Sequence, residues 1–198
     1  MMRRKQTGVG TDEKAVLVRY LDQLREAWLW KLEGVDDLDV RRPLTPTGTN
    51  LLGLTKHVAA CAAEYFGLVF DRPFPGDLPF SDDDPLIDLW CPADESRTDV
   101  IDLWERAWAH AHATIEALPL DAPGQVPWWG DRGAVTLHQI LVHMAVELAR
   151  HAGQVDVLRE GLDGFAGLRP GVENMPDDPD WPAHVARVEE AAQEAAGR

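Results

Sequence analysis

Glu147 and His151 lie one helical turn apart in the stretch HMAVELARHAGQ, residues 143–154. With about 100° of rotation per residue, the pair falls on the same side of a helix as the apolar residues Ile140, Met144, Val155 and Leu158. An unpaired carboxylate on a buried face is costly or takes up a proton. The pattern therefore predicts a compensating partner, for which an arginine, a metal ion and a shared proton are the candidates.

A metal ion accounts for more of this pattern than the other two. Side chains at i and i+4 of a helix project side by side, so that a carboxylate oxygen and an imidazole nitrogen can reach one ion. A third ligand has to come from a facing helix, and His57 lies on the inward side of another predicted helix. Three protein ligands with one open position are typical of catalytic zinc sites, whereas structural sites have four.

Other interpretations of these residues stay open at this point. His143 is the main rival ligand, but it lies on the opposite side of Glu147 from His151 and is expected outside the ligand set. Cys61, one turn after His57, is either a soft fourth ligand or, as we expect, a small buried hydrophobic side chain. Without a metal, His57 is a core histidine, and Glu147 and His151 share a hydrogen bond.

Four amphipathic helices have to position these residues. Apolar residues recur at spacings of three and four after Thr11, after Asn50, after Ser96 and after Thr136. Ser96 and Thr136 each begin a capping pattern, with an acid or an amide three residues later. Gly34 is expected to end the first helix, and Gly161 or Gly164 the fourth. The stretches 71–95 and 119–135 are expected to be long loops, and we find no convincing strand.

This pattern predicts an all-α fold, a four-helix bundle over residues 11–164 with long connecting loops. Residues 1–10 are expected to form a flexible tail. Residues 165–198 are expected to be a Pro/Asp-rich arm, packed on the bundle, that can form a short terminal helix. Within the loops, Trp128 and Trp129 are candidates for the wall of a substrate pocket, and Arg150 on the fourth helix is a candidate for binding a substrate carboxylate.

Charge and composition exclude several classes of partner. The formal net charge is −15, with 34 acidic residues against 19 Lys and Arg. Such a surface repels nucleic acid and anionic lipid, so neither is expected as a partner. The N-terminus has no apolar segment typical of a signal peptide, and no apolar run is long enough for a membrane span. Cys61 and Cys91 form no disulfide framework, so we expect a cytoplasmic protein.

The segment TGTNLLGLTKHVAACAAEYFGLVF, with TLHQILVHMAVELARHAGQVDVLREGLDG far downstream, resembles the DinB-like superfamily. Within it, the sequence is most similar to the actinobacterial branch of mycothiol S-transferases, over roughly residues 12–164. The resemblance implies a bundle that binds a divalent metal through His57, Glu147 and His151. Glu147 in the middle position is similar to the mycothiol-dependent maleylpyruvate isomerases. Gln154 and His138 depart from the branch, which more often has His and Arg there.

The resemblance also implies an activity, the conjugation of mycothiol to an electrophilic small molecule, as in detoxification. Zinc is the expected metal, although nickel, iron and manganese suit the same ligands. A metal-dependent isomerase or hydrolase, or a tailoring enzyme of natural-product synthesis, is one alternative. A non-catalytic metal- or ligand-binding bundle of a stress response is another. A homodimer is compatible with all of these.

Overall fold

The computed structural model describes residues 12–197. Within them it has five α-helices: α1 (Glu13–Leu32), α2 (Leu51–Tyr65), α3 (Arg97–Ala117), α4 (Leu137–Asp163) and α5 (Trp181–Ala196). Three short 3-10 helices lie in the connections: η1 (Leu68–Phe70), η2 (Ile87–Leu89) and η3 (Pro127–Arg132). The expected flexible tail, residues 1–10, lies outside the described residues.

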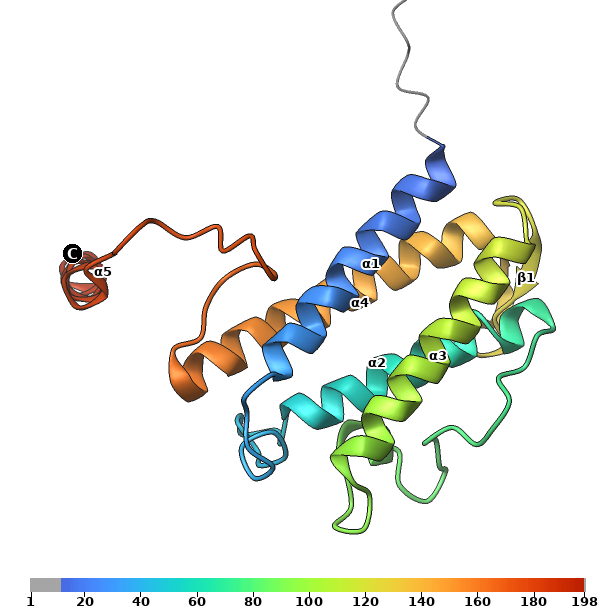
Figure 1. Ribbon diagram of the computed structural model, residues 1–198, viewed down its shortest axis with the longest axis horizontal. Helices are drawn as coiled ribbons and strands as arrows, with labels where there is room; N and C mark the ends of the chain where they lie inside the picture. Colours follow the sequence, from blue (N-terminus) through green and yellow to red (C-terminus); the bar gives the residue numbers. More distant parts are fainter. Residues whose placement is uncertain (1–11, 198) are drawn as a thin grey trace, which may run out of the picture.

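Helices α1 to α4 pack as a bundle around one hydrophobic core, which confirms the predicted all-α fold (Figure 1). α1 lies along α4, and α2 packs against both α3 and α4. Figure 1 shows that α2 and α3 run in one direction, and α1 and α4 in the other. Because α2 and α3 are parallel neighbours, the chain has to return along the bundle between them, and the long segment 66–96 makes this connection.

Three tryptophans fill the centre of the core. Trp28 of α1 and Trp104 and Trp108 of α3 are at most 1% exposed. The ring centroids of Trp28 and Trp104 lie 5.4 Å apart, which is the range of favourable aromatic packing. Trp28 Nε1 also donates a hydrogen bond of 2.9 Å to Thr55 Oγ1 of α2. This bond holds α2 against α1 at Thr55, two residues before His57.

Capping residues set where α3 and α4 begin, as the sequence predicts. Ser96 Oγ accepts a hydrogen bond from the Asp99 backbone N–H, and the Asp99 carboxylate accepts one from the Ser96 N–H. Thr136 Oγ1 likewise accepts from the Gln139 N–H at 3.3 Å. α4 ends at Gly164, whose φ of 77° is the left-handed conformation that glycine adopts without strain.

Two helix boundaries differ from the prediction. α1 is capped by Asp12, whose carboxylate accepts from the Lys14 N–H, and Thr11 lies outside the described residues. α2 ends at Tyr65, although the apolar pattern continues to residue 70. The chain leaves the helix at Gly67, so close to α2 that a Cβ there would lie 2.3 Å from the carbonyl oxygen of Ala63.

A short antiparallel pair of strands was not predicted. β1 (Pro123–Gln125) and β2 (Ala134–Thr136) pair inside the expected loop 119–135, with Gly124 opposite Val135. Strands of three residues are too short to show an alternating apolar pattern. The pair brings the start of α4 back against η1, since β1 contacts η1 and β2 leads directly into α4.

The segment after Gly164 begins against the bundle and then leaves it. Phe165 packs edge-on against Trp30 of α1, with ring centroids 4.7 Å apart, and lies 4.5 Å from the Arg159 guanidinium carbon. α5 follows, but none of its side chains is buried, and Figure 1 shows it standing apart from the bundle. Packing on the bundle is thus seen at the start of the arm, whereas we expected it for the whole arm. None of the helices in residues 12–197 is long and apolar enough to cross a membrane.

Candidate metal centre

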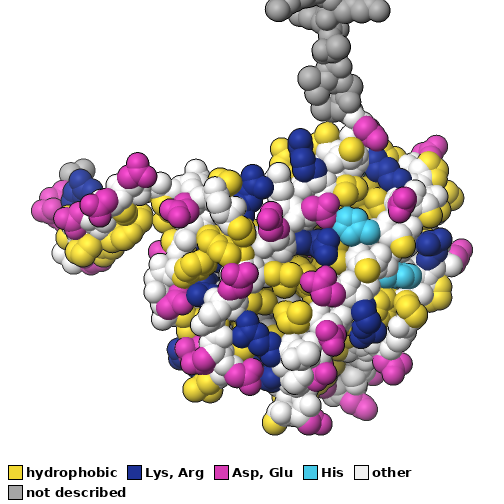
Figure 2. Space-filling model, viewed as in Figure 1, with side chains coloured by type: hydrophobic (Ala, Val, Ile, Leu, Met, Phe, Trp, Pro, Cys, Tyr) yellow, Lys and Arg dark blue, Asp and Glu magenta, His cyan; other side chains and the backbone are white. Residues whose placement is uncertain are grey.

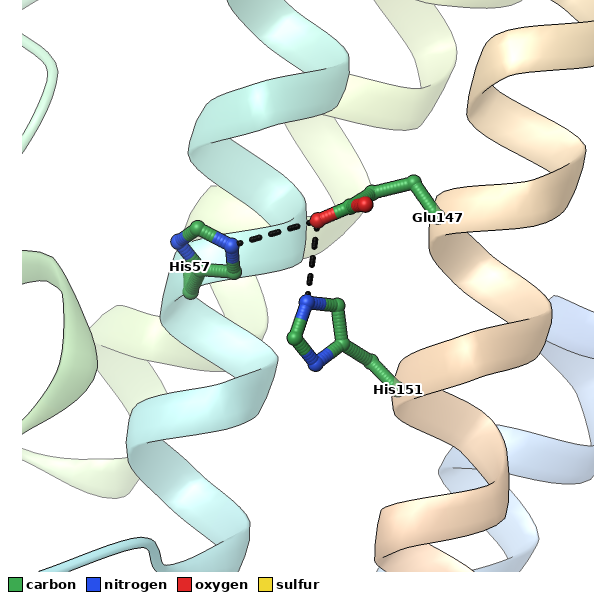
Figure 3. A group of neighbouring side chains, drawn as sticks. All are labelled: His57, Glu147 and His151. Carbon is green, nitrogen blue, oxygen red and sulfur yellow. Dashed lines mark hydrogen bonds and ion pairs between the residues drawn. The ribbon is translucent and has the colours of Figure 1, made fainter. Parts of the chain in front are cut away.

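His57, Glu147 and His151 meet between α2 and α4. His57 comes from α2, and Glu147 and His151 come from successive turns of α4 (Figure 3). Glu147 Oε1 lies 2.9 Å from His151 Nε2 and 3.5 Å from His57 Nε2. One potential ligand atom from each residue lies within 4.8 Å of the other two. Two imidazole nitrogens and a carboxylate oxygen, all pointing to one place, are a donor set that suits zinc or another divalent transition metal.

A second layer of hydrogen bonds fixes both imidazole rings. His57 Nδ1 lies 2.6 Å from Asp88 Oδ2, and His151 Nδ1 lies 2.6 Å from Gln154 Oε1. Both partners are acceptors, so each Nδ1 carries the proton and donates it outward. In a neutral imidazole the Nε2 lone pair then faces Glu147. Histidines that bind metals in proteins almost always have such an outer acceptor.

The three side chains are only partly buried. Their exposed fractions are 20% for His57, 25% for Glu147 and 15% for His151, so solvent and small molecules reach the group. Burial lowers the pKa of His57, but hydrogen bonds with Cys61 and Glu147 outweigh it and raise that pKa to about 11. Hydrogen bonds from His151 and His57 hold the pKa of the Glu147 carboxyl far below its ordinary value. The Glu147 carboxylate is therefore stabilised by a positive charge beside it, which either a proton on a histidine or a metal cation supplies.

The 3-10 helix η2 brings Asp88 to the site, and three contacts hold η2 on α2. At Gly53 the helix lies so close to η2 that a Cβ would be 1.9 Å from the carbonyl oxygen of Leu89. Lys56, which is 2% exposed, donates a 3.0 Å hydrogen bond to the Trp90 carbonyl and pairs with Glu95 at 2.7 Å. Asn50 reaches the Leu89 carbonyl at 3.5 Å. Asp88 is thus delivered to His57 by a packed segment.

The two rival ligands lie beside the group rather than in it. Cys61 Sγ is 3.7 Å from His57 Nε2, one turn along α2, and the thiol is partly buried. His143 packs against Tyr65 and Trp129, with ring centroids 4.6 and 4.9 Å away. Burial lowers the pKa of His143, against an opposing effect of Glu147, so its imidazole is favoured in the neutral form.

Of the residues predicted to contact the substrate, Trp128 and Trp129 pack close to the site, whereas Arg150 points to solvent. Trp128 Nε1 donates a 3.2 Å hydrogen bond to the Tyr65 hydroxyl, and Trp129 lies 5.9 Å from the Tyr65 ring. With His143 and Tyr65 they form an aromatic cluster on the Cys61 side of the site. The Arg150 side chain is exposed and forms no hydrogen bond or ion pair with another residue of the described chain. His138 lies at the start of α4, where it contacts Glu13 at 3.3 Å.

A cavity of about 480 Å³ opens on the other side of the site, where His151 and Gln154 form part of its wall. The rest of the wall comes from the loop before α2, from Leu54 of α2 and from the η2 segment. Trp90, a third tryptophan of the long loops, lies in this wall. The group of three is thus flanked by an aromatic cluster and by a cavity.

Asp88 was not predicted as a partner of the site. Its signal is a single acid inside the apolar run PLIDLW, and Asp88 is indeed only 7% exposed. An acid among apolar residues in a proline-rich loop carries no distance information, so its partner could not be named. Gln154 was noted only as a departure from the related sequences, and the structure gives it a contact with His151.

These observations define a helical bundle with a group of potential metal ligands across two of its helices. A family model described as mycothiol-S-transferase matches residues 16–164, which include α1 from Val16 on, all of α2 to α4, and all three residues of the group. The chain belongs to the mycothiol S-transferase family. A comparison with curated proteins finds no match.

Proposed function

We propose that this protein is a divalent-metal-dependent mycothiol S-transferase, with His57, Glu147 and His151 as the metal ligands. The observation that carries the proposal is the convergence of two Nε2 atoms on one carboxylate oxygen, with both Nδ1 atoms bound to outer acceptors. Family membership supports the transfer of a thiol sulfur. Zinc is the metal we expect, although nickel, iron(II) and manganese(II) suit the same two nitrogens and one oxygen.

In this proposal the side chains of the protein hold and orient the metal ion, and none of them acts as a separate nucleophile. Asp88 and Gln154 fix the two imidazole rings, and Glu147 supplies the negative charge that favours a cation. A bound divalent ion supplies Lewis acidity, which lowers the pKa of a thiol beside it so that the thiol loses its proton near neutral pH. The partial exposure of the three side chains leaves access for a thiol and for its electrophilic partner.

The test is direct conjugation with the purified protein, mycothiol and a chromogenic electrophile. We expect turnover with mycothiol that stops after removal of the metal by a chelator and returns when zinc is added back. Turnover that is insensitive to chelation, or absent with mycothiol and with other small thiols under every metal tried, contradicts the proposal. The second result favours an isomerase or hydrolase, or a binding protein without catalysis.

The proposal has three further parts, and the third, the homodimer, is compatible with the bundle but is not implied by the sequence. The electrophile is a small molecule, the reaction takes place in the cytoplasm, and the protein forms a homodimer. Light scattering after size-exclusion chromatography tests the dimer, with a single species of one chain mass as the contrary outcome. Fractionation of cells that express the tagged full chain tests the location.

A further inference from the structure

The outer side of α4 carries a continuous apolar stripe. Its five residues recur at spacings of three and four and are all exposed: Val142, Val146, Ala149, Gly153 and Val157. The three valines are 43%, 63% and 70% exposed, and a Cβ at Gly153 would meet nothing within 4 Å. Within residues 12–197, α4 packs on α1 and α2, and no other helix covers this outer side (Figure 1). We call these five residues the α4 stripe.

The α4 stripe borders a cavity of about 370 Å³ between α4 and α1, since Ala149 belongs to both. The other apolar residues that line this cavity on the two helices are Tyr20, Leu24, Ala27, Trp28, Ala152 and Val155. Tyr20 is 54% exposed, whereas Trp28 and Val155 are buried. Isolated exposed apolar residues are ordinary in soluble proteins, but a stripe of about 22 Å beside an apolar cavity is typical of a contact surface.

Acidic side chains are nearly absent from this surface, although the chain has 34 Asp and Glu and a formal net charge of −15. Between residues 142 and 157 the only acids are Glu147 and Asp156. Glu147 belongs to the proposed metal ligands, and Asp156 is bound to Lys31 at 3.1 Å. Arg150, exposed at the edge of the stripe, adds a positive charge. Two copies therefore repel each other less through this surface than through one that carries the average density of acids.

We propose that the α4 stripe and the cavity beside it bind a second copy of this chain, and that the homodimer forms through this surface. In a two-fold dimer the same surface lies on both sides of the contact, so it has to supply both the protruding and the receiving parts. Tyr20 and Val146 protrude, and the cavity and the small residues Ala149 and Gly153 leave room for them. The proposal rests on one part of the proposed function, the homodimer, and is independent of metal binding and thiol transfer.

The size of the surface sets the expected affinity. A stripe about 22 Å long on a helix about 10 Å wide, together with the adjoining side of α1, covers on the order of 500 Å² on each copy. The resulting total of about 1,000 Å² is the lower limit for a specific interface. We therefore expect a dissociation constant of about 1–100 µM for the dimer.

Self-association of the full chain and its dependence on salt test the apolar character of the contact. Sedimentation equilibrium from about 1 to 200 µM protein gives the dissociation constant. Raising the NaCl concentration from about 0.05 to 0.5 M should tighten the dimer, because the contact is apolar and salt screens the repulsion between two acidic molecules. A protein that stays monomeric over this range of concentration, or a dimer that salt weakens, would overturn the proposal.

Variants at exposed residues locate the contact. Val146→Glu, and independently Ala149→Glu, should weaken the dimer about tenfold or more, since each places an unpaired charge in an apolar contact. Val185→Glu is the matched control and should leave the dimer unchanged, because Val185 is 62% exposed and lies on α5, which also has an exposed apolar side. Circular dichroism checks that each variant is folded.

The outcomes separate this surface from the other proposals. If Val146→Glu and Ala149→Glu dimerise like the wild type, or if Val185→Glu weakens the dimer equally, the assigned surface is wrong and the homodimer forms elsewhere. A dimer that behaves as expected, in a protein that neither binds a metal nor transfers a thiol, contradicts only the rest of the proposed function.

Discussion

Each imidazole ring of the site is oriented by a hydrogen bond at its Nδ1 atom, from His57 to Asp88 and from His151 to Gln154. Asp88 contacts no proposed ligand other than His57 and acts as a positioning residue. We expect Asp88→Ala to weaken zinc binding about 10- to 100-fold, the usual cost of losing an outer partner of a metal-binding histidine. Competition with a chromophoric chelator measures this affinity.

Two further substitutions distinguish positioning from a general loss of charge. Asp88→Asn should recover part of the affinity, because an amide oxygen still accepts the hydrogen bond from His57 Nδ1. Asp83→Ala, in the same loop but with an exposed carboxylate, should bind zinc like the wild type. Equal affinities of Asp88→Ala and Asp83→Ala would show that Asp88 has no role in the site.

At the scale of elements, the site depends on how η2 lies against α2. Gly53→Ala would place a methyl group 1.9 Å from the Leu89 carbonyl oxygen, which is backbone, so η2 has to move and carry Asp88 away from His57. We expect zinc affinity to fall about tenfold or more, and the free energy of unfolding to fall by about 1–3 kcal/mol. Chelator competition and thermal unfolding measure the two quantities.

Gly161→Ala is the matched control, because Gly161 is also helical and a Cβ there meets nothing within 4 Å. This variant should be neutral or slightly stabilised, since alanine favours helix more than glycine does. If Gly53→Ala binds zinc as tightly as Gly161→Ala, the packing of η2 on α2 does not position the site.

The elements differ in how far the sequence predicts them. Helices α3 and α4 follow from their apolar spacing and from Ser96 and Thr136, because caps and periodicity are local signals. The end of α2 does not, because Gly67 breaks the helix inside a continuing apolar pattern. The position of η2 does not follow from the sequence either, because the close approach at Gly53 joins segments far apart in the chain. The convergence of His57 with Glu147 and His151 was predicted from their inward helix faces, together with the family resemblance.

At the scale of the whole molecule, buried contacts hold the bundle together, whereas the end of the arm after it has none. Arg159 is 4% exposed and donates to the carbonyl oxygens of Lys31 and Glu33, so it joins α4 to the end of α1. Phe165 packs beside it, but α5 has no buried side chain. Figure 2 shows hydrophobic side chains along one side of α5 and acidic ones along another. We propose that residues 11–164 fold independently of α5.

Truncation after residue 180 tests this division. We expect the shortened chain to keep its melting temperature within about 2 °C, because isolated helices of about this length are only marginally stable in water and contribute little. In the full chain, the backbone amides of α5 should exchange hydrogen much faster than those of α2 and α4. Strong protection of α5, or a large fall in melting temperature on truncation, would mean that its apolar side is packed in solution.

His57, Glu147 and His151 are proposed to bind one divalent ion together, and the proposed function requires this ion. The direct measurement is titration of the chelator-treated protein with zinc, in competition with a chromophoric chelator. We expect one site per chain in the wild type and a loss of affinity of about 100-fold or more in His57→Ala and in Glu147→Gln. The neighbouring rival His143→Ala should stay close to the wild type, and circular dichroism checks that each variant is folded. No stoichiometric site in the wild type for zinc, nickel, iron(II) or manganese(II), or variants of His57 and Glu147 that bind like the wild type, would contradict the claim.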